Sequence, residues 1–344
     1  MTTNTRNSHG YSIIELMVAI ALGLLILAGL TTIFVSNSRA RSEIERASQQ
    51  TDNGRYALRL LTDGLHNAGY LAEFNPRPLI TPAAKPDPCA TALTTLNTAL
   101  PLAVQGYDNG AGAPACLSDV KTGSDILVVR HASTCAVGDA NCNALIAGAP
   151  YFQASKCSSA TELSSTIVAN YYALDTNTAN LTRHQNDCVA LAAFHQYRTY
   201  IYFVANNDKS GDGIPTLKRA ELGASGFSIV PLVEGIEELQ IEYGIDTSVP
   251  TSGAPAVFTA DPDSYSGCAV ATCMGYWRNT VVAKIYLLAR NTTTTSGYTD
   301  GKTYSLGRNA DGTPNTIGPF NDQYKRHLYA STVRLNNTAG RNTP

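Results

Sequence analysis

The chain has 344 residues, which is enough for one large hydrophobic core or for two small ones. Its formal net charge is -2 and it has no long run of Lys and Arg, so we expect no direct nucleic-acid partner. Only 15% of the residues are charged, whereas Thr, Asn, Ala and Gly are abundant, and this composition favours an all-β or α+β domain outside the cytoplasm.

An apolar segment follows a short polar N-terminus. Residues 1–10 are polar, and residues 13–35 are apolar apart from Glu15 and two threonines. At about 1.5 Å per residue, such a segment spans a bilayer core of about 30 Å, so it is predicted to be a transmembrane helix. A secretory signal peptide would have a shorter apolar region and a small-residue cleavage site, which Ser36-Asn37-Ser38-Arg39 does not provide.

Glu15 is the unusual residue of this segment. A carboxylate in an apolar span costs roughly 2.5–3.5 kcal/mol at mid-membrane and less near the interface, and such groups usually have a partner. The sequence therefore predicts a cationic partner for Glu15.

One stretch resembles the type IV prepilin cleavage motif, namely His9-Gly10-Tyr11-Ser12-Ile13-Ile14-Glu15-Leu16-Met17-Val18. The resemblance implies that a prepilin peptidase cuts after Gly10 and that the new amino group of Tyr11 is N-methylated. It also implies that Glu15 pairs with the terminal amine of a neighbouring subunit, so that a buried charge sets the register of assembly. The chain departs from the family in having Tyr11 where most members have Phe.

The helix is predicted to continue beyond the membrane. No Pro occurs before Pro76, whereas major pilins commonly have one inside the apolar helix. Gly69 is the predicted stop, because Gly adopts positive φ at low cost. We therefore expect a stem helix over residues 11–69. Seven residues recur near one face of its polar half, which would pack on a globular head: Ile44, Ala47, Thr51, Leu58, Leu61, Leu65 and Ala68.

Several phrases resemble PilW-like minor pilins in the same order. They are Asn53-Gly54-Arg55-Tyr56-Ala57-Leu58-Arg59-Leu60-Leu61 with His66-Asn67-Ala68-Gly69-Tyr70, then Asp212-Gly213-Ile214-Pro215, then residues 233–243 and 332–337. This resemblance covers about the first 70 residues and much of residues 198–337.

Residues from about 74 to 190 are rich in Pro, Ala, Thr, Ser, Gly and Cys, and clear strand character lies mainly at residues 125–130. We expect a loop-rich insert there. It contains six of the eight cysteines, whose even number and position beyond the apolar segment indicate disulfides in an oxidising compartment. No Cys-x-x-Cys pair supports a zinc site. The close pairs Cys135/Cys142 and Cys268/Cys273 are the expected local bridges, although eight cysteines allow about 105 connectivities.

The later part of the chain is predicted to form strands. Apolar and polar residues alternate over Glu238–Ile245, which is typical of a half-buried strand. Thr199–Ala205, Val281–Arg290 and Leu328–Leu335 are rich in β-branched and aromatic residues. We expect an antiparallel sheet packed on the stem helix.

One loop has a weak calcium-like pattern. Asp208, Ser210 and Asp212 alternate as at the start of a calcium loop, but Arg219 stands where a bidentate Glu is required. A hairpin turn is therefore the favoured interpretation. The six His are scattered and neither an HExxH pair nor a G-x-S-x-G turn occurs, so we expect no catalytic residue, no resident metal and no cofactor.

Together the resemblances imply a type IV pilin-like α+β fold, with a long N-terminal hydrophobic helix packed on an antiparallel β-sheet head that has a loop-rich, disulfide-bearing insert. They imply a leader of residues 1–10, a single-pass anchor in the inner membrane and a periplasmic head of residues 70–344. The mature chain would join or prime a pilus fibre at the cell surface. Its partners would be the prepilin peptidase, other minor and major pilins, and the inner-membrane assembly platform.

Two alternatives stay open. A type II secretion pseudopilin of the J type shares the stem and head design. A signal-anchored periplasmic enzyme or calcium-binding module would use the loop from Asp208 to Gly213. A leader-processing assay and a calcium titration distinguish these alternatives.

Overall fold

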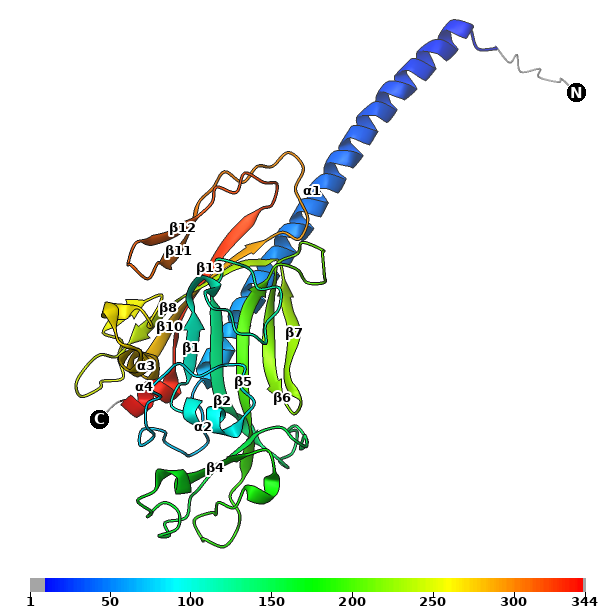
Figure 1. Ribbon diagram of the computed structural model, residues 1–344. Coiled ribbons are helices and arrows are strands. Elements are labelled where there is room, and N and C mark those ends of the chain that lie inside the picture. Colours follow the sequence, from blue (N-terminus) through cyan, green and yellow to red (C-terminus); the bar gives the residue numbers. More distant parts are fainter. Residues whose placement is uncertain (1–9, 343–344) are drawn as a thin grey trace, which may run out of the picture. The chain divides into compact units, whose positions relative to one another are not determined.

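The structure of the chain is a computed structural model that describes residues 10–342. The chain forms two compact units, one within residues 1–49 and one that begins at Gln50. A single helix, α1 (Ile13–Asn67), contributes residues to both units (Figure 1). Of the predicted leader, residues 1–10, all but Gly10 lie outside the described residues.

The second unit contains two larger antiparallel sheets and a small hairpin (Figure 1). The seven-stranded sheet consists of β1 (Val104–Tyr107), β2 (Ile126–Ala136), β3 (Tyr151–Ala154), β4 (Tyr172–Asp175), β5 (Phe194–Ala205), β6 (Thr216–Gly223) and β7 (Gly226–Glu234). The four-stranded sheet has the order β13-β10-β8-β9 and consists of β8 (Ile236–Ile245), β9 (Val257–Thr259), β10 (Thr280–Arg290) and β13 (Arg326–Arg334). The hairpin pairs β11 (Tyr304–Arg308) with β12 (Pro314–Ile317).

Short helices complete the second unit. The α-helices after α1 are α2 (Leu93–Ala99), α3 (Val270–Arg278) and α4 (Asn336–Asn342). Single 3-10 turns occur at Asp108–Gly110, Val168–Tyr171, Thr178–Asn180 and Tyr265–Gly267.

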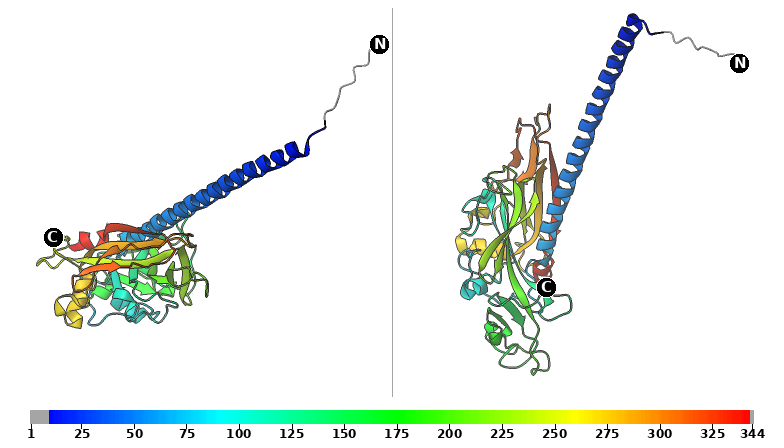
Figure 2. Two further views of the ribbon diagram at one scale, coloured as in Figure 1. Left: turned by 90° about the horizontal axis from the view of Figure 1, so that it is seen from above. Right: turned by 90° about the vertical axis from the view of Figure 1, so that its right-hand side faces the viewer.

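The part of α1 that belongs to the second unit packs into a core shared by both sheets, as predicted for the stem. Leu61 and Leu65 are completely buried there, and Figure 2 shows strands running alongside this part of the helix. Of the predicted face, Leu61, Leu65 and Ala68 are buried within the second unit, whereas Ile44 belongs to the first unit. Two glycines that were not predicted to matter belong to the buried face, because the rings of Tyr329 and Tyr202 lie directly over Gly54 and Gly64.

The end of α1 is closed by residues from α4. Gly69 has a φ of +73°, which confirms the predicted stop, and its N–H donates to the carbonyl of Arg130 at 2.8 Å. Asn337 Nδ2 donates to the carbonyl of Ala68 at 3.0 Å, and Arg341 Nη1 donates to the carbonyl of Gly69 at 2.6 Å. Within α1 itself, the carbonyls of Leu65 and Asn67 accept backbone N–H groups, and that of His66 accepts a hydrogen bond from Asn337 Nδ2 at 3.3 Å.

The strands predicted in the second half of the chain are present, and the predicted Glu238–Ile245 is part of β8. The half-buried character predicted for β8 is wrong, because every residue of β8 is buried. Glu238 forms an ion pair with Lys121 and Gln240 accepts a hydrogen bond from Asn315 at 3.0 Å. The polar face is therefore covered by the loop before β2 and by the β11–β12 hairpin.

The insert predicted to be loop-rich contains more regular structure than expected. Besides β2, which begins where a strand was predicted, it forms β1, β3, β4 and α2. In β2, Leu127 faces the core with α1, whereas Ile126 and Val128 face the other side of the sheet. That second side is covered by Leu117 and Val120 of the insert. The continuous apolar run of β2 follows from this burial on both faces.

Four disulfides tie the second unit together, and no free cysteine occurs in the described residues. Both local pairs expected from the sequence are bonded. The bonds are Cys89–Cys116, Cys135–Cys142, Cys157–Cys188 and Cys268–Cys273.

Candidate assembly site at the N-terminus

The start of α1 is fixed by hydrogen bonds between Ser12 and Glu15. The Ser12 hydroxyl accepts the N–H of Ile14 at 3.3 Å, and Oε2 of Glu15 accepts the N–H of Ser12 at 2.9 Å. This arrangement is a capping box, in which the first and fourth residues of an S-x-x-E sequence satisfy orphan N–H groups. The capping role of Ser12 and Glu15 was not predicted from the sequence, although their S-x-x-E spacing is the pattern that indicates a capping box.

This cap occupies only one carboxylate oxygen of Glu15. Within residues 10–342, Oε1 of Glu15 makes no hydrogen bond or ion pair, and the side chain is exposed. Negative charge is favourable at this position because the first turn of a helix carries partial positive charge. Glu15 therefore caps its own helix through one oxygen, and its other oxygen has no partner among the described residues.

The predicted scissile residues lie immediately before the cap. Tyr11 is 92% exposed, and a Cβ atom added at Gly10 would meet no atom within 4 Å. Neither residue belongs to a helix or a strand. The peptide bond between Gly10 and Tyr11 is thus accessible and free of secondary structure.

The apolar span exposes its side chains all around the helix. Every large apolar side chain from Ile13 to Val35 is between 46% and 80% exposed. Within the described residues, α1 is the one helix long and apolar enough to cross a membrane, with a mean hydropathy of 2.7 over its most apolar window. The hydroxyls of Thr31 and Thr32 donate to carbonyls of the preceding turn at 2.8–2.9 Å, so they need no outside partner. This surface suits lipid or other apolar helices.

The calcium-like loop is a hairpin connection between β5 and β6, as favoured from the sequence. The carboxylate of Asp212 accepts N–H groups of its own loop, from Asp208 at 3.1 Å, Lys209 at 2.8 Å and Ile214 at 2.9 Å. Ser210 is exposed. Among residues 10–342, no three His, Cys, Asp or Glu side chains gather as metal ligands. The geometry is that of an Asx turn and gives the calcium interpretation no support.

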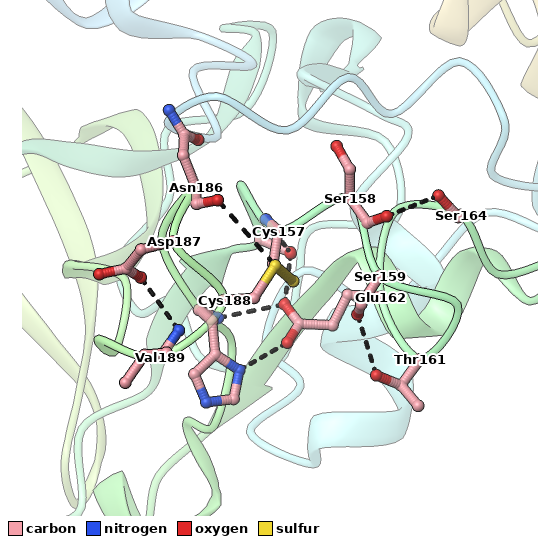
Figure 3. Close-up of a disulfide and its surroundings, with 12 residues drawn as sticks. Cys157, Ser158, Ser159, Thr161, Glu162, Ser164, Asn186, Asp187, Cys188 and Val189 are labelled. Carbon is pink, nitrogen blue, oxygen red and sulfur yellow. Dashed lines mark hydrogen bonds and ion pairs between the residues drawn. A yellow bond between two sulfur atoms is a disulfide. The ribbon is translucent and has the colours of Figure 1, made fainter.

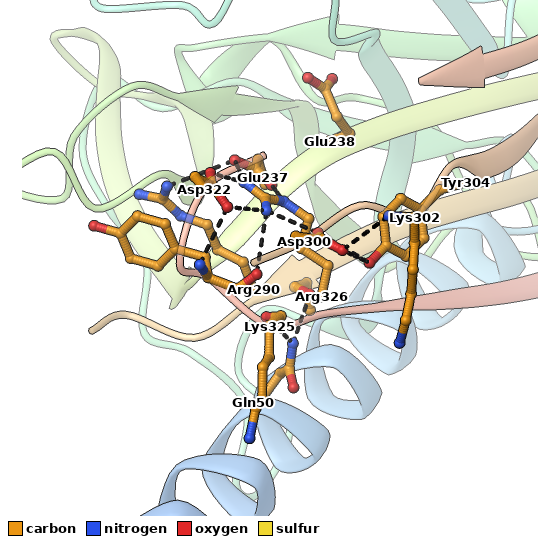
Figure 4. A network of polar contacts seen from close by, with 12 residues as sticks. Gln50, Glu237, Glu238, Arg290, Asp300, Lys302, Tyr304, Asp322, Lys325 and Arg326 are labelled. Atoms are coloured by element: carbon orange, nitrogen blue, oxygen red, sulfur yellow. Dashed lines mark hydrogen bonds and ion pairs between the residues drawn. The ribbon is translucent and has the colours of Figure 1, made fainter. Parts of the chain in front are cut away.

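A buried ion network lies where α1 enters the second unit (Figure 4). Arg326, whose side chain is 1% exposed, pairs with Glu237, with Asp300 at 2.9 Å and with Asp322 at 2.6 Å. Gln50 of α1 donates beside it to the carbonyl of Lys325 at 2.7 Å. The network holds β13, β8 and the loop before β11 together. Most of these charges are far apart in the sequence, and their meeting was not predicted.

A second polar cluster lies beside the disulfide Cys157–Cys188 (Figure 3). Glu162 accepts a hydrogen bond from Ser155 and contacts Nδ1 of His184 at 2.6 Å. Burial by itself would raise the pKa of Glu162, but these hydrogen bonds outweigh it and hold the pKa below its ordinary value. Ser155 contacts Glu162 rather than His184, so the three residues do not form a nucleophile–base–acid relay.

Comparisons with known proteins found two family models that match this chain, one in its second half and one at its N-terminus. The family described as Type IV Pilus-assembly protein W matches residues 201–337, and the prokaryotic N-terminal methylation motif matches residues 5–31. A type IV-like pilin from Thermus thermophilus is a similar solved structure, with 12% identity and a TM-score of 0.36 over 84% of this chain and 96% of that chain. No curated protein sequence matches the chain.

Proposed function

Because this chain is a PilW-like type IV minor pilin with a structural role, we propose that it is made as a prepilin, cleaved between Gly10 and Tyr11, and methylated on the new amino group of Tyr11. The exposed, non-helical Gly10–Tyr11 peptide supports cleavage at this bond. Cleavage removes the polar leader, so the mature chain begins one residue before the cap of α1.

The mature chain assembles through α1. The observation that carries this proposal is the free Oε1 of Glu15 beside a capped helix end. In a filament, the terminal amine of a neighbouring subunit would donate to this oxygen. Because a buried carboxylate without a partner is costly, a subunit in the wrong register would be disfavoured.

The chain is a membrane-anchored pilin, and its place before and after assembly is part of the proposal. The apolar part of α1 anchors it in the inner membrane with the head in the periplasm, and the mature chain then joins a pilus fibre with other minor and major pilins. The four disulfides support an oxidising compartment for the head. The prepilin peptidase and the assembly platform are the proposed machinery.

Mass spectrometry of the intact chain and of its N-terminus tests the processing step. In cells with prepilin peptidase, the expected product starts at methylated Tyr11, and in cells without the peptidase it retains residues 1–10. An unprocessed chain in both strains, or a cut after Val35, would refute the prepilin assignment.

Two substitutions of Glu15 distinguish its capping hydrogen bond from its negative charge. E15Q keeps an acceptor for the N–H of Ser12 but removes the charge, whereas E15A removes both. We expect both variants to be processed and to lose incorporation into pili, and E45A, a change at an exposed Glu of the same helix, to assemble normally. Normal incorporation of E15Q would show that the charge pair is not needed.

A further inference from the structure

A small cavity lies at the junction of the end of α1, the end of α3 and α4. Its volume is about 30 Å³, close to the share of one water molecule in the liquid. Its walls include Arg77, Arg278, Thr338, Arg341 and Asn342. The cavity thus gathers side chains from three distant parts of the sequence.

The charged groups of this cavity are all guanidinium groups. Arg278 donates to the carbonyls of Leu79 at 2.9 Å and Arg77 at 2.6 Å, and Arg341 donates to the carbonyl of Gly69 at 2.6 Å. These acceptors are neutral. No carboxylate lines the cavity, and within residues 10–342 none of the three arginines forms an ion pair. Among the residues that the structure describes, no carboxylate balances this positive charge.

The surroundings of the half-buried Arg278 and Arg341 disfavour the charged forms of both side chains. Burial, and then the neighbouring charge of Arg77, lower the pKa of Arg278. Burial lowers the pKa of Arg341 to about 10. A partly buried cation without a counter-charge is disfavoured, and a bound anion would remove much of that cost.

A neutral donor of the same cavity also lacks a partner. Asn342 is 7% exposed, and its Nδ2 is buried with no hydrogen-bond partner. Buried polar groups in folded proteins are nearly always paired, so such a group calls for an explanation. An acceptor bound in the cavity would satisfy Asn342 Nδ2 and the guanidinium groups together.

We propose that this cavity is a binding site for a tetrahedral oxyanion, a phosphate or sulfate group. Arg278 and Arg341 supply charge from the walls, the exposed Arg77 closes on the group from the mouth, and Thr338 and Asn342 add hydrogen bonds. The volume admits one oxygen of the group, so the remaining oxygens lie at the mouth beside Arg77. Occupancy would join the end of α1 to α4 and α3.

The test uses the full-length chain in detergent, with thermal unfolding followed through Trp277, which is the single Trp and is 1% exposed. Inorganic phosphate and sulfate should raise the unfolding midpoint in a saturable manner, whereas chloride at equal ionic strength should not. Glycerol 3-phosphate serves as the second probe. A similar effect would indicate that the site accepts a headgroup phosphate, and a response to inorganic phosphate alone would indicate a free ion.

Variants link the effect to the cavity. R77Q removes a side chain that makes no hydrogen bond within residues 10–342, so the fold should be retained, and N342A removes the orphan donor. Each should weaken phosphate binding by about tenfold or more, which is the contribution of one charge-assisted or buried hydrogen bond. R55Q, at an exposed Arg of α1 outside the cavity, should respond like the wild type. An unsaturable response, or an equal one in R77Q and N342A, would overturn the proposal.

Discussion

Gly54 is the position at which the packing of α1 on the head can be tested most directly. The residue lies in the interior of α1, under the ring of Tyr329 from β13. A Cβ atom at position 54 would lie 2.2 Å from Cε2 of Tyr329 and 2.6 Å from Cδ2. Carbon atoms pack at about 3.5–4.0 Å, so in G54A the ring has to retreat by more than about 1 Å.

Two effects of opposite sign determine how much G54A changes the free energy of unfolding. Alanine is favoured over glycine in a helix interior by about 1 kcal/mol. Overpacking of a well-filled core costs about 1–3 kcal/mol. The Tyr329 ring is confined by β13, which pairs with β10, and by the ring of His327, whose centroid is 4.7 Å away. The upper part of the range therefore applies, and G54A should lower the free energy of unfolding by a net value of about 1–2 kcal/mol.

Chemical denaturation of the full-length chain in detergent, followed through Trp277 fluorescence, measures this change. G275A in α3 is the matched control, because a Cβ atom there meets nothing within 4 Å. It should raise the free energy of unfolding by about 0.5–1 kcal/mol through helix propensity alone. If G54A were stabilised as much as G275A, the close packing of Tyr329 on α1 would be refuted.

The ion network around Arg326 provides two further predictions. R326M removes the cation of the network and leaves Glu237 with Arg290 at 3.6 Å and Asp300 with the hydroxyl of Tyr304. It should lower the free energy of unfolding by about 3 kcal/mol in the same denaturation assay, and a loss below about 1 kcal/mol would contradict the network. The hydrogen bond from Arg326 lowers the pKa of Asp322 in the folded protein. The ionised Asp322 therefore contributes its full stabilisation above the pKa of about 4 that the group has in the unfolded chain. This stabilisation is lost as the pH falls through the lower pKa of the folded protein. The stability difference between wild type and D322N should therefore narrow as the pH falls below about 4, and a constant difference would be inconsistent with that linkage.

The strands of the second half of the chain were predictable because their signal is local. The apolar residues of β10 and β13 cluster within single short stretches, and turn residues bound them. The environment of β8 was not predictable, because the groups that bury its polar face come from far away. Lys121 lies 117 residues before its partner Glu238, and no local pattern records such a pairing.

The N-terminal site likewise combines features that were predictable from the sequence with one that was not. The positions of Gly10, Tyr11 and Glu15 follow from a short motif, which the methylation-motif match also covers. The double use of Glu15, with one oxygen on the cap and one free, depends on side-chain geometry that residue order alone does not give. The arginine cavity could not be foreseen, because its residues have no spacing in common.

The hydrogen bonds that close the end of α1 have a consequence for biosynthesis. Asn337 and Arg341 contact carbonyls of residues that lie 271 and 272 positions earlier in the chain. Contacts of such long sequence separation form late, since the intervening chain must first lose its freedom. Under the proposed export of the head, the carbonyls that Asn337 and Arg341 contact would stay bonded to water until α4 had emerged on the far side of the membrane. The head would then reach its final form only when translocation was complete.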